Sequence, residues 1–179
     1  MTSSLLTQAL KEAYASAPSH VVILDTLELR HPAFRNEAEP KALRLVRNYQ
    51  DLVARLEDNA PLEGGCYVTF TALAFDLTLP PLESVPVPEI VVHIDNVSRY
   101  LMPYLDQASI SPFPIEMTYR PYLSTHLEAP QMTPPLTLTL SEVVATAFSI
   151  TARARMLDVG SLPFPSLTYT PKAFPGLVR

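Results

Sequence analysis

A histidine and an aspartate in one short segment are the first candidates for chemistry in this chain. His93 and Asp95 lie two residues apart within EIVVHID, so on a strand their side chains would point to the same side. A carboxylate beside an imidazole can polarise the ring for general acid–base catalysis. A capping aspartate beside an edge histidine explains the same spacing, and we favour that interpretation.

Metal binding and thiol chemistry are weakly indicated. The four histidines, at positions 20, 31, 93 and 126, show no H-x-H or H-x-x-x-H spacing, although a site could still assemble in space. Cys66 is the single cysteine and has no histidine near it in sequence, whereas a catalytic thiol needs a base and an electropositive setting. We therefore expect Cys66 to be a small buried residue, and we expect no disulfide, metal or cofactor.

Arginine with tyrosine is a frequent composition of protein–protein contacts and supplies a third kind of candidate site. Arg120 lies near Tyr119 and Tyr122, and Arg153 and Arg155 share one face of a strand segment. A solvated strand face explains these residues equally well. The residues predicted for an interface, four of them in the C-terminal segment, are Arg120, Tyr122, Arg153, Arg155, Pro163, Pro165, Tyr169 and Phe174.

The composition argues against an enzyme and against nucleic-acid binding. The chain has 19 proline and 4 glycine residues, too few glycines for a phosphate-binding loop, and G-x-S-x-G and H-E-x-x-H motifs do not occur. The net charge is −5 and the 13 lysine and arginine residues do not cluster, whereas binding a phosphate backbone needs a basic face. No window approaches the ~18 apolar residues of a membrane span, so we expect none.

Two segments predict helices that would flank the strands. Residues 4–15 carry an apolar stripe with helical spacing, and Pro18 would stop this helix. A second stripe follows Asp95-Asn96, a pair typical of helix N-caps, and continues for about three turns. Pro103 falls within the second stripe and should kink or shorten that helix, because proline cannot donate an interior hydrogen bond.

Apolar, β-branched and alternating segments predict seven or eight strands. They are residues 20–30, 43–46, 51–57, 66–79, 89–95, 113–123, 136–144 and 147–157. The segment 51–57 also suits a helix, but its place between two turn signals favours a strand. His31-Pro32 should end the first strand and residues 35–42 should form a turn. A two- or three-residue turn near Ala145 should join the last two strands as a hairpin.

These elements predict a mainly β fold. The natural assembly is an antiparallel β-sandwich or barrel with an N-terminal helix and one short flanking helix. Residues 1–160 would form a single β-rich domain that includes the helix at 4–15. Residues 161–179 would form an extended C-terminal arm, and the proline-rich segments 80–88 and 128–135 would be extended as well, because proline restricts the backbone.

Several of these stretches together resemble one family. They are 17–29 (APSHVVILDTLEL) with the following His31-Pro32-Ala33-Phe34, 86–101 (PVPEIVVHIDNVSRYL), 114–124 (PIEMTYRPYLS), 129–140 (APQMTPPLTLTL) and 150–160 (ITARARMLDVG). From about residue 10 to residue 177, the chain resembles an uncharacterised domain family encoded in the tail-tip gene clusters of siphophages and prophages. These motifs are structural and bring no active-site residues with them. Residues 36–42 look like an insertion relative to the family, and Pro103 interrupts the helix.

The resemblance implies a minor tail protein in the tail tip, or baseplate, of a long-tailed, non-contractile bacteriophage. Such proteins form threefold or sixfold rings, so the implied partners are further copies of the chain, the tail tube protein, the tape-measure protein and the hub or tip proteins. The implied location is the virion, after synthesis in the host cytoplasm. The alternative is a β-sandwich that binds a small ligand or carbohydrate at a host surface, with Tyr67, Tyr100, Tyr119 and Tyr122 as candidate lining residues.

Overall fold

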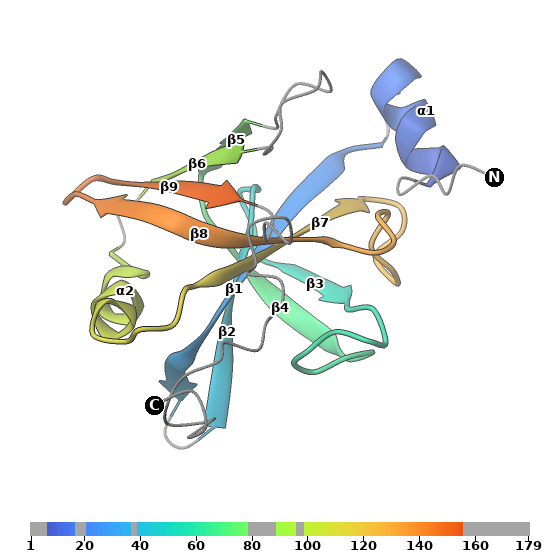
Figure 1. The fold of residues 1–179 in the computed structure, drawn as a ribbon. Coiled ribbons are helices and arrows are strands. Elements are labelled where there is room, and N and C mark those ends of the chain that lie inside the picture. The colour runs from blue at the N-terminus through green and yellow to red at the C-terminus, as the bar shows by residue number, and fades with distance from the viewer. Residues whose placement is uncertain (1–6, 17–20, 37–38, 79–88, 96–98, 156–179) are drawn as a thin grey trace, which may run out of the picture.

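The computed structural model of the chain describes residues 7–16, 21–36, 39–78, 89–95 and 99–155. These residues form two helices and nine strands (Figure 1), which confirms the predicted mainly β fold class. In chain order the elements are α1 (Gln8–Ser16), β1 (Ile23–Asn36), β2 (Glu39–Val46), β3 (Leu52–Arg55), β4 (Tyr67–Ala72), β5 (Phe75–Thr78), β6 (Glu89–Asp95), α2 (Met102–Ser109), β7 (Glu116–Leu123), β8 (Leu136–Ala145) and β9 (Ser149–Arg155).

The nine strands of the described residues belong to one strongly curved sheet (Figure 1) in the order β3-β4-β2-β1-β7-β8-β9-β6-β5. Most neighbours are antiparallel, but β2 and β4 run parallel, with Leu45 opposite Thr71. The sheet is therefore mixed rather than antiparallel throughout. It has two edge strands, β3 and β5, and it is not closed into a barrel.

A break at Leu73-Ala74 divides the predicted strand 66–79 into β4 and β5. The Leu73 amide donates to the Val46 carbonyl at the end of β2, and the Asp95 amide at the end of β6 donates to the Ala74 carbonyl. Although β4 and β5 follow each other in the chain, β4 pairs with β2 near one end of the strand order and β5 pairs with β6 at the other end. The break brings those two ends of the curved sheet close together without closing it.

The main core lies inside the curve of the sheet and draws buried apolar residues from seven strands and α2. A second, smaller cluster packs β3 and β4 against Tyr122 of β7. Helix α1 packs separately, through Leu10 and Ala13 against Leu123. Burying apolar side chains contributes most of the favourable free energy of such folds. The central strands lie between the two larger clusters, so we expect them to be the most stable part of the sheet.

Strand β7 is buried on both faces, which the sequence did not predict. Met117 and Tyr119 face the main core as expected, but Thr118 and Arg120 on the other face are also buried, at 2% and 0% exposure. β7 lies at the middle of the sheet between β1 and β8. Its alternating sequence is typical of a strand with one solvent-exposed face. In the structure, the segment that joins β3 to β4 covers that face.

Both helices begin later than predicted. Described residues place α1 at Gln8–Ser16, after the non-helical Thr7, and residues 4–6 of the predicted helix lie outside the described part. Helix α2 starts at Met102 with Leu101 as its N-cap, so Asp95 stays in β6 and is not the cap. Pro103 therefore occupies the first turn of α2, where its missing N–H costs nothing and no kink is needed.

Prolines also explain where two strands depart from the prediction. β1 continues past His31-Pro32 to Asn36, and its pairing with β2 shifts between Arg30 and Arg35. A bulge of this kind accepts a proline because no ladder hydrogen bond is required there. β7 begins at Glu116, after Pro114, rather than at Phe113.

Other predicted elements are confirmed. The ambiguous segment 51–57 contains strand β3, and β8 and β9 form the predicted hairpin, with Ala145 opposite Ile150. Residues 80–88 and 161–179, predicted as extended, lie outside the described residues, whereas 128–135 is described and has no regular structure. Among the described residues, neither helix has the length and apolar character needed to cross a membrane.

Candidate functional site

Two of the predicted interface residues, Arg120 and Tyr122, are interior residues, which corrects their assignment to an interface. Both side chains have 0% exposure. The Tyr122 hydroxyl donates to the Arg55 carbonyl at 2.9 Å, and the Arg120 guanidinium makes a two-pronged contact with Glu57, at 2.7 Å for each bond. The contact links β7 to the end of β3, so these residues hold the sheet and its cover together and present no surface to a partner.

Arg120 belongs to a buried cluster of charges on the second face of β1, β2 and β7. Glu28, with 0% exposure, is at its centre and accepts a hydrogen bond from Arg44 Nε at 2.9 Å. Its other oxygen lies 3.6 Å from Arg30 Nε and from Arg120 Nη1. Three arginines thus surround one buried glutamate, and a charge in such a position needs close partners to offset its lost hydration.

Exposed or half-buried glutamates complete the cluster from the segment between β3 and β4. Glu57 and Glu63 pair with Arg120 and Arg44. Burial alone would raise the pKa of Glu57, but the hydrogen bonds and charge of Arg120 outweigh it and hold that pKa below its ordinary value. The ion pairs fasten this segment over the face of the central strands, which is a structural role.

Arg153 and Arg155 lie on the outer face of β9, as predicted. Both are exposed, and Arg153 Nε lies 3.4 Å from Glu142 Oε2 across the hairpin. An exposed pair of this kind contributes little to stability. The other predicted interface residues, Pro163, Pro165, Tyr169 and Phe174, lie outside the described residues.

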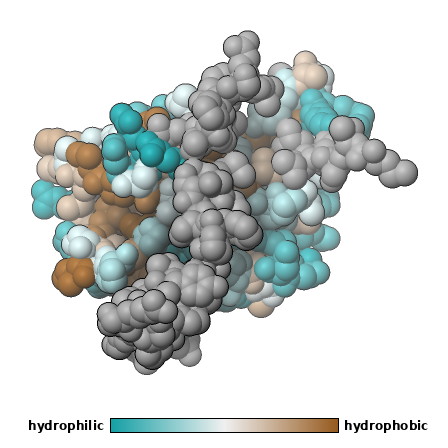
Figure 2. Space-filling model, viewed as in Figure 1, coloured by the Kyte–Doolittle hydropathy of each residue, from teal (hydrophilic) through white to brown (hydrophobic). Residues whose placement is uncertain are grey.

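An apolar surface at the tip of the β8–β9 hairpin was not predicted. Val143, Val144 and Phe148 of the hairpin are 37%, 62% and 77% exposed, and Ile110 at the C-terminal end of α2 is 88% exposed. We call these four residues the hairpin patch. Val143 and α2 line a common hollow of about 320 Å³. Figure 2 shows apolar residues gathered on this side, where Figure 1 places α2 and the hairpin tip. Large apolar side chains grouped on a surface commonly mark a contact site.

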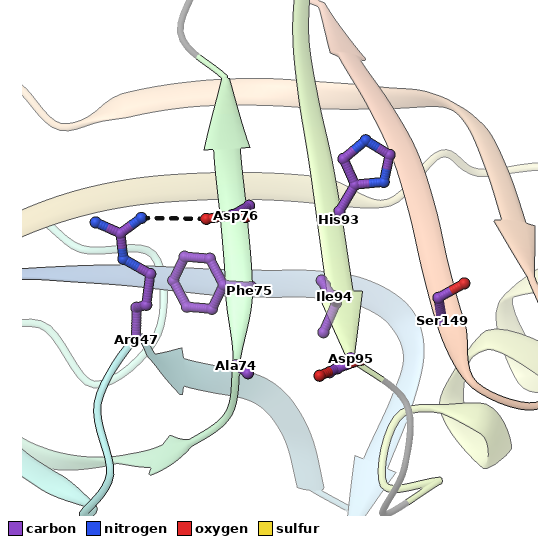
Figure 3. A pocket seen from close by; sticks show the side chains of 8 residues that line it. All are labelled: Arg47, Ala74, Phe75, Asp76, His93, Ile94, Asp95 and Ser149. Atoms are coloured by element: carbon purple, nitrogen blue, oxygen red, sulfur yellow. Dashed lines mark ion pairs between the residues drawn. The ribbon is translucent and has the colours of Figure 1, made fainter.

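An open cleft with a cavity volume of about 370 Å³ lies beside β5, β6 and β9. It contains the His93–Asp95 pair, but Figure 3 shows the imidazole directed away from the Asp95 carboxylate. His93 Nδ1 instead lies 3.0 Å from the hydroxyl of Thr151. Asp95 therefore does not polarise the imidazole in this structure.

Arg47 lines this cleft together with two carboxylates, Asp76 and Asp95. The Arg47 guanidinium lies 2.6 Å from Asp25. It also lies 3.5 Å from Asp76, the ion pair drawn in Figure 3. An adjoining hollow of about 680 Å³ is lined by the fully exposed Tyr49 together with apolar residues such as Leu73. An aromatic ring beside charged groups could hold a small polar ligand.

The cysteine and histidine predictions have mixed outcomes. Cys66 is a free thiol but is exposed, which corrects the expected burial. His31 is buried in β1, with Nε2 3.0 Å from the Phe113 carbonyl. His126 is an exposed loop residue that contacts Gln131, and His20 lies outside the described residues. No group of three or more potential metal ligands comes together among the described residues.

Sequence reasoning missed the hairpin patch because its residues fit an ordinary strand pattern. The one signal was Val143-Val144 at the end of a segment whose turn also carries Phe148. Apolar residues on both sides of a hairpin tip have no core to enter. The partners of Glu28 left no comparable signal, because Arg30, Arg44 and Arg120 come from three different strands.

Together these features define a class of protein: a mainly β domain with an open mixed sheet, a charge cluster that fastens its cover, and an exposed apolar tip. The chain belongs to the family described as Domain of unknown function (DUF1833), which matches residues 9–169. No curated protein matches the chain. The family extends over all eleven described helices and strands except the first residue of α1.

Proposed function

We propose that this protein is a structural component of a bacteriophage tail tip or baseplate and forms part of a ring between the tail tube, the tape-measure protein and the central hub. The hairpin patch is the observation that carries the proposal. Its Phe148 and Ile110 expose apolar surface on a domain whose other large apolar residues are mostly in its cores. The resemblance of the sequence to proteins of tail-tip gene clusters supplies the phage setting.

The open sheet also suits a ring subunit. A ring needs two different surfaces on each copy, one that meets the copy ahead and one that meets the copy behind. The sheet has two edge strands, β3 and β5, and an edge strand can accept another strand through its main chain. The hairpin patch and the basic face of β9 then act as side-chain contacts of the assembled ring.

A complementation experiment tests the proposal in a phage that lacks the gene for this chain. Replacing Val144 and Phe148 with serine removes the two more exposed apolar side chains that the hairpin gives to the patch, without entering a core. We expect the variant to fold but to yield few or no infectious tails. Val22→Ser is the matched control, because Val22 is 57% exposed outside the patch, and it should complement normally. Infectious particles at wild-type yield from the patch variant would contradict the proposal.

A direct observation tests the phage setting itself. Purified tails should contain the chain at a copy number of three or six, or a small multiple, when they are analysed by electron cryomicroscopy. Deleting residues 161–179 should leave a folded protein but impair incorporation into tails. Absence of the chain from purified tails, or normal incorporation of the truncated chain, would contradict these two parts of the proposal separately.

Ligand binding is the second candidate function. The observation that favours it is the pair of adjoining hollows lined by Arg47, one of which also includes Tyr49. Two of its predicted lining residues, Tyr119 and Tyr122, are buried, so the site would lie at the cleft and not where the sequence placed it. Saturable binding of a sugar from the host surface, lost in Tyr49→Ser, would support this function. It would be contradicted by a lack of binding across a panel of host surface sugars.

A further inference from the structure

The core side of the β8–β9 hairpin is open to solvent near its tip. Val143 and Ala145 lie opposite Ala152 and Ile150, which are buried in the main core. Side chains directly opposite each other on paired strands share one face of the sheet, so Val143 and Ala145 belong to the core side as well. Both are nevertheless exposed. The apolar face of the hairpin therefore continues beyond the part of the core that the described residues cover.

Helix α2 forms the opposite wall of this opening, and Figure 1 shows it beside the hairpin tip. The hollow between the two elements has a volume of about 320 Å³, and we call it the α2 groove. Its apolar lining includes Met102, Leu105, Ile115, Val143 and Ala145. The volume lies at the lower end of the range for small-ligand sites, which is enough for the ring of an aromatic side chain.

Asp106 is the one charged residue that lines the groove. It is exposed, and its carboxylate has no ion-pair partner among the residues that the structure describes. Complementary charges favour a partner and like charges exclude one. The groove therefore suits a segment that carries a cation close to a large apolar side chain, and it disfavours a segment that carries an acidic one.

The chain itself contains such a segment outside the described residues. Residues 170–179 (TPKAFPGLVR) place Lys172 two positions before Phe174, and they include no aspartate or glutamate. Residues 79–88 (LPPLESVPVP) also lie outside the described part and are apolar, but their one charged side chain is Glu83. Asp106 would repel Glu83 and attract Lys172, so charge favours residues 170–179.

The length of the chain after β9 allows residues 170–179 to reach the groove. Strand β9 ends at Arg155, and the stretch from there to Lys172 can span up to roughly 55 Å when extended. The way back along β9 to the hairpin tip is only about 20 Å. Pro171 and Pro175 lack main-chain donors, so a groove that takes side chains suits this segment better than the open edge of a strand.

We propose that residues 170–179 dock in the α2 groove, with Phe174 in the hollow and Lys172 paired with Asp106. The inference names what contacts the hairpin side of the molecule, and it rests on the proposed function only in treating that side as a contact surface. The length of the chain permits docking in the same copy or in a neighbouring copy, and the experiment assigns one of them.

Paramagnetic NMR of the full chain tests the proposal. A nitroxide is attached to Gly176→Cys in the Cys66→Ser background, where the exposed native thiol is removed. We expect strong broadening of the backbone amides of Leu105, Asp106 and Val143, measured against the same sample after the nitroxide is reduced with ascorbate. Absence of broadening at these three amides would overturn the proposal.

Mixing two preparations assigns the copy that supplies the segment. One preparation carries ¹⁵N and no nitroxide, and the other carries the nitroxide without ¹⁵N. Broadening of the groove amides in the mixture means docking in a neighbouring copy, whereas broadening only when one chain carries both labels means docking in the same copy. Either result supports the proposed contact, and absence of broadening in both samples would overturn it.

A charge exchange tests the pairing of Lys172 with Asp106. Asp106→Lys and Lys172→Glu should each reduce the paramagnetic relaxation rate of the Val143 amide at least threefold, because each change places two like charges together. The double variant Asp106→Lys/Lys172→Glu should restore the rate. Unchanged rates in the single variants, or no recovery in the double variant, would overturn the pairing.

A matched pair of variants tests the role of Phe174. Phe174→Ser should reduce the relaxation rate at least threefold, while Phe164→Ser, the same change elsewhere in the C-terminal segment, should leave it within a factor of about two. Equal effects of the two variants would overturn the assignment of Phe174 to the hollow. These measurements involve no phage protein besides this chain, so the docking and the proposed role in a tail can fail separately.

Discussion

Glu28 and Arg120 have no exposed surface, and both carry charge. Removing a charge from water is costly, and the cost is offset only where partners are close and well oriented. Arg120 has such a partner in Glu57, through two bonds of 2.7 Å. Glu28 is held by Arg44 and by two more distant arginines. At the residue scale, the fold therefore depends on charges that cannot be removed one at a time.

The first prediction concerns that dependence. Arg120→Met should lower the free energy of unfolding by about 3–5 kcal/mol, because Glu57 would lose the arginine that bonds it and the buried Glu28 would lose one of its three cations. Urea unfolding followed by circular dichroism measures the change. Arg153→Gln is the control, since its pair with Glu142 is half exposed, and it should cost less than about 1 kcal/mol. Similar losses in both variants would show that the cluster has no special role.

The second prediction concerns acid stability. The pKa of Glu57 is lowered in the folded protein, so its ionised form stabilises the fold at pH values above the pKa of the unfolded chain. That contribution is lost as the pH falls from the unfolded value, roughly 4.3, through the folded one. Glu57→Gln should flatten this part of the curve of unfolding free energy against pH. An unchanged acid limb in the variant would contradict the assignment.

Residue-scale features were only partly predictable from the sequence. Alternation in β9 correctly placed Arg153 and Arg155 on an outer face, because one side of β9 remains open. The same reasoning failed for Arg120, whose side of β7 is covered by Glu57, 63 residues away in sequence. A local pattern gives the direction of a side chain, but not whether a distant segment covers it.

At the scale of elements, the segment between β3 and β4 has two glycines at positions where a larger residue would clash or be strained. A side chain at Gly64 would place its Cβ 2.6 Å from the Asp58 carbonyl oxygen. Gly65 adopts a φ of +71°, a conformation that favours glycine. The segment carries Glu57 and Glu63 to their arginine partners, so its shape and the charge cluster depend on each other.

The third prediction tests this coupling. Gly64→Ala should lower the free energy of unfolding by about 1–3 kcal/mol, because the new Cβ must displace backbone atoms. Asn59→Ala, an exposed change in the same segment, should stay within about 0.5 kcal/mol of wild type. Denaturant unfolding of both variants provides the measurement. Equal stability of Gly64→Ala and wild type would mean that the segment can move away from the sheet.

Element types were more predictable than element ends. Turn residues on both sides of 51–57 correctly favoured strand β3, and alternation correctly gave the β8–β9 hairpin. The break at Leu73-Ala74 left no proline or glycine signal, because the pairing of β4 and β5 with opposite ends of the sheet causes it. Pro103 was assigned to a helix interior only because the helix start was placed too early.

At the scale of the whole molecule, the sheet is best held at its middle. β1 and β7 pair over eight residues, from Ile23 opposite Leu123 to Arg30 opposite Glu116. The edge strands β3 and β5 each have four residues. Strands covered on both faces open only with the whole domain, whereas short edges open locally.

The fourth prediction follows from this difference in stability between central and edge strands. In hydrogen exchange, amides of β1 and β7 should exchange slowest and report global unfolding, and those of β5 should exchange fastest among the strands. NMR exchange rates of individual amides test the order. A β5 strand as protected as β7 would indicate that its edge is covered, for example by another copy, and exchange at two protein concentrations would distinguish that case.

The long register between β1 and β7 also has a consequence for the order of folding during synthesis. Thr26 bonds to the Arg120 carbonyl across 94 positions of the chain. At about 5–20 residues per second, β1 would wait roughly 5–20 s for that partner to be made. The β1–β2 hairpin can form early, but its second edge would stay open with Leu27 and Leu29 unprotected. Codons that slow translation of the intervening stretch should therefore increase aggregation of the nascent chain, without any change to the finished protein.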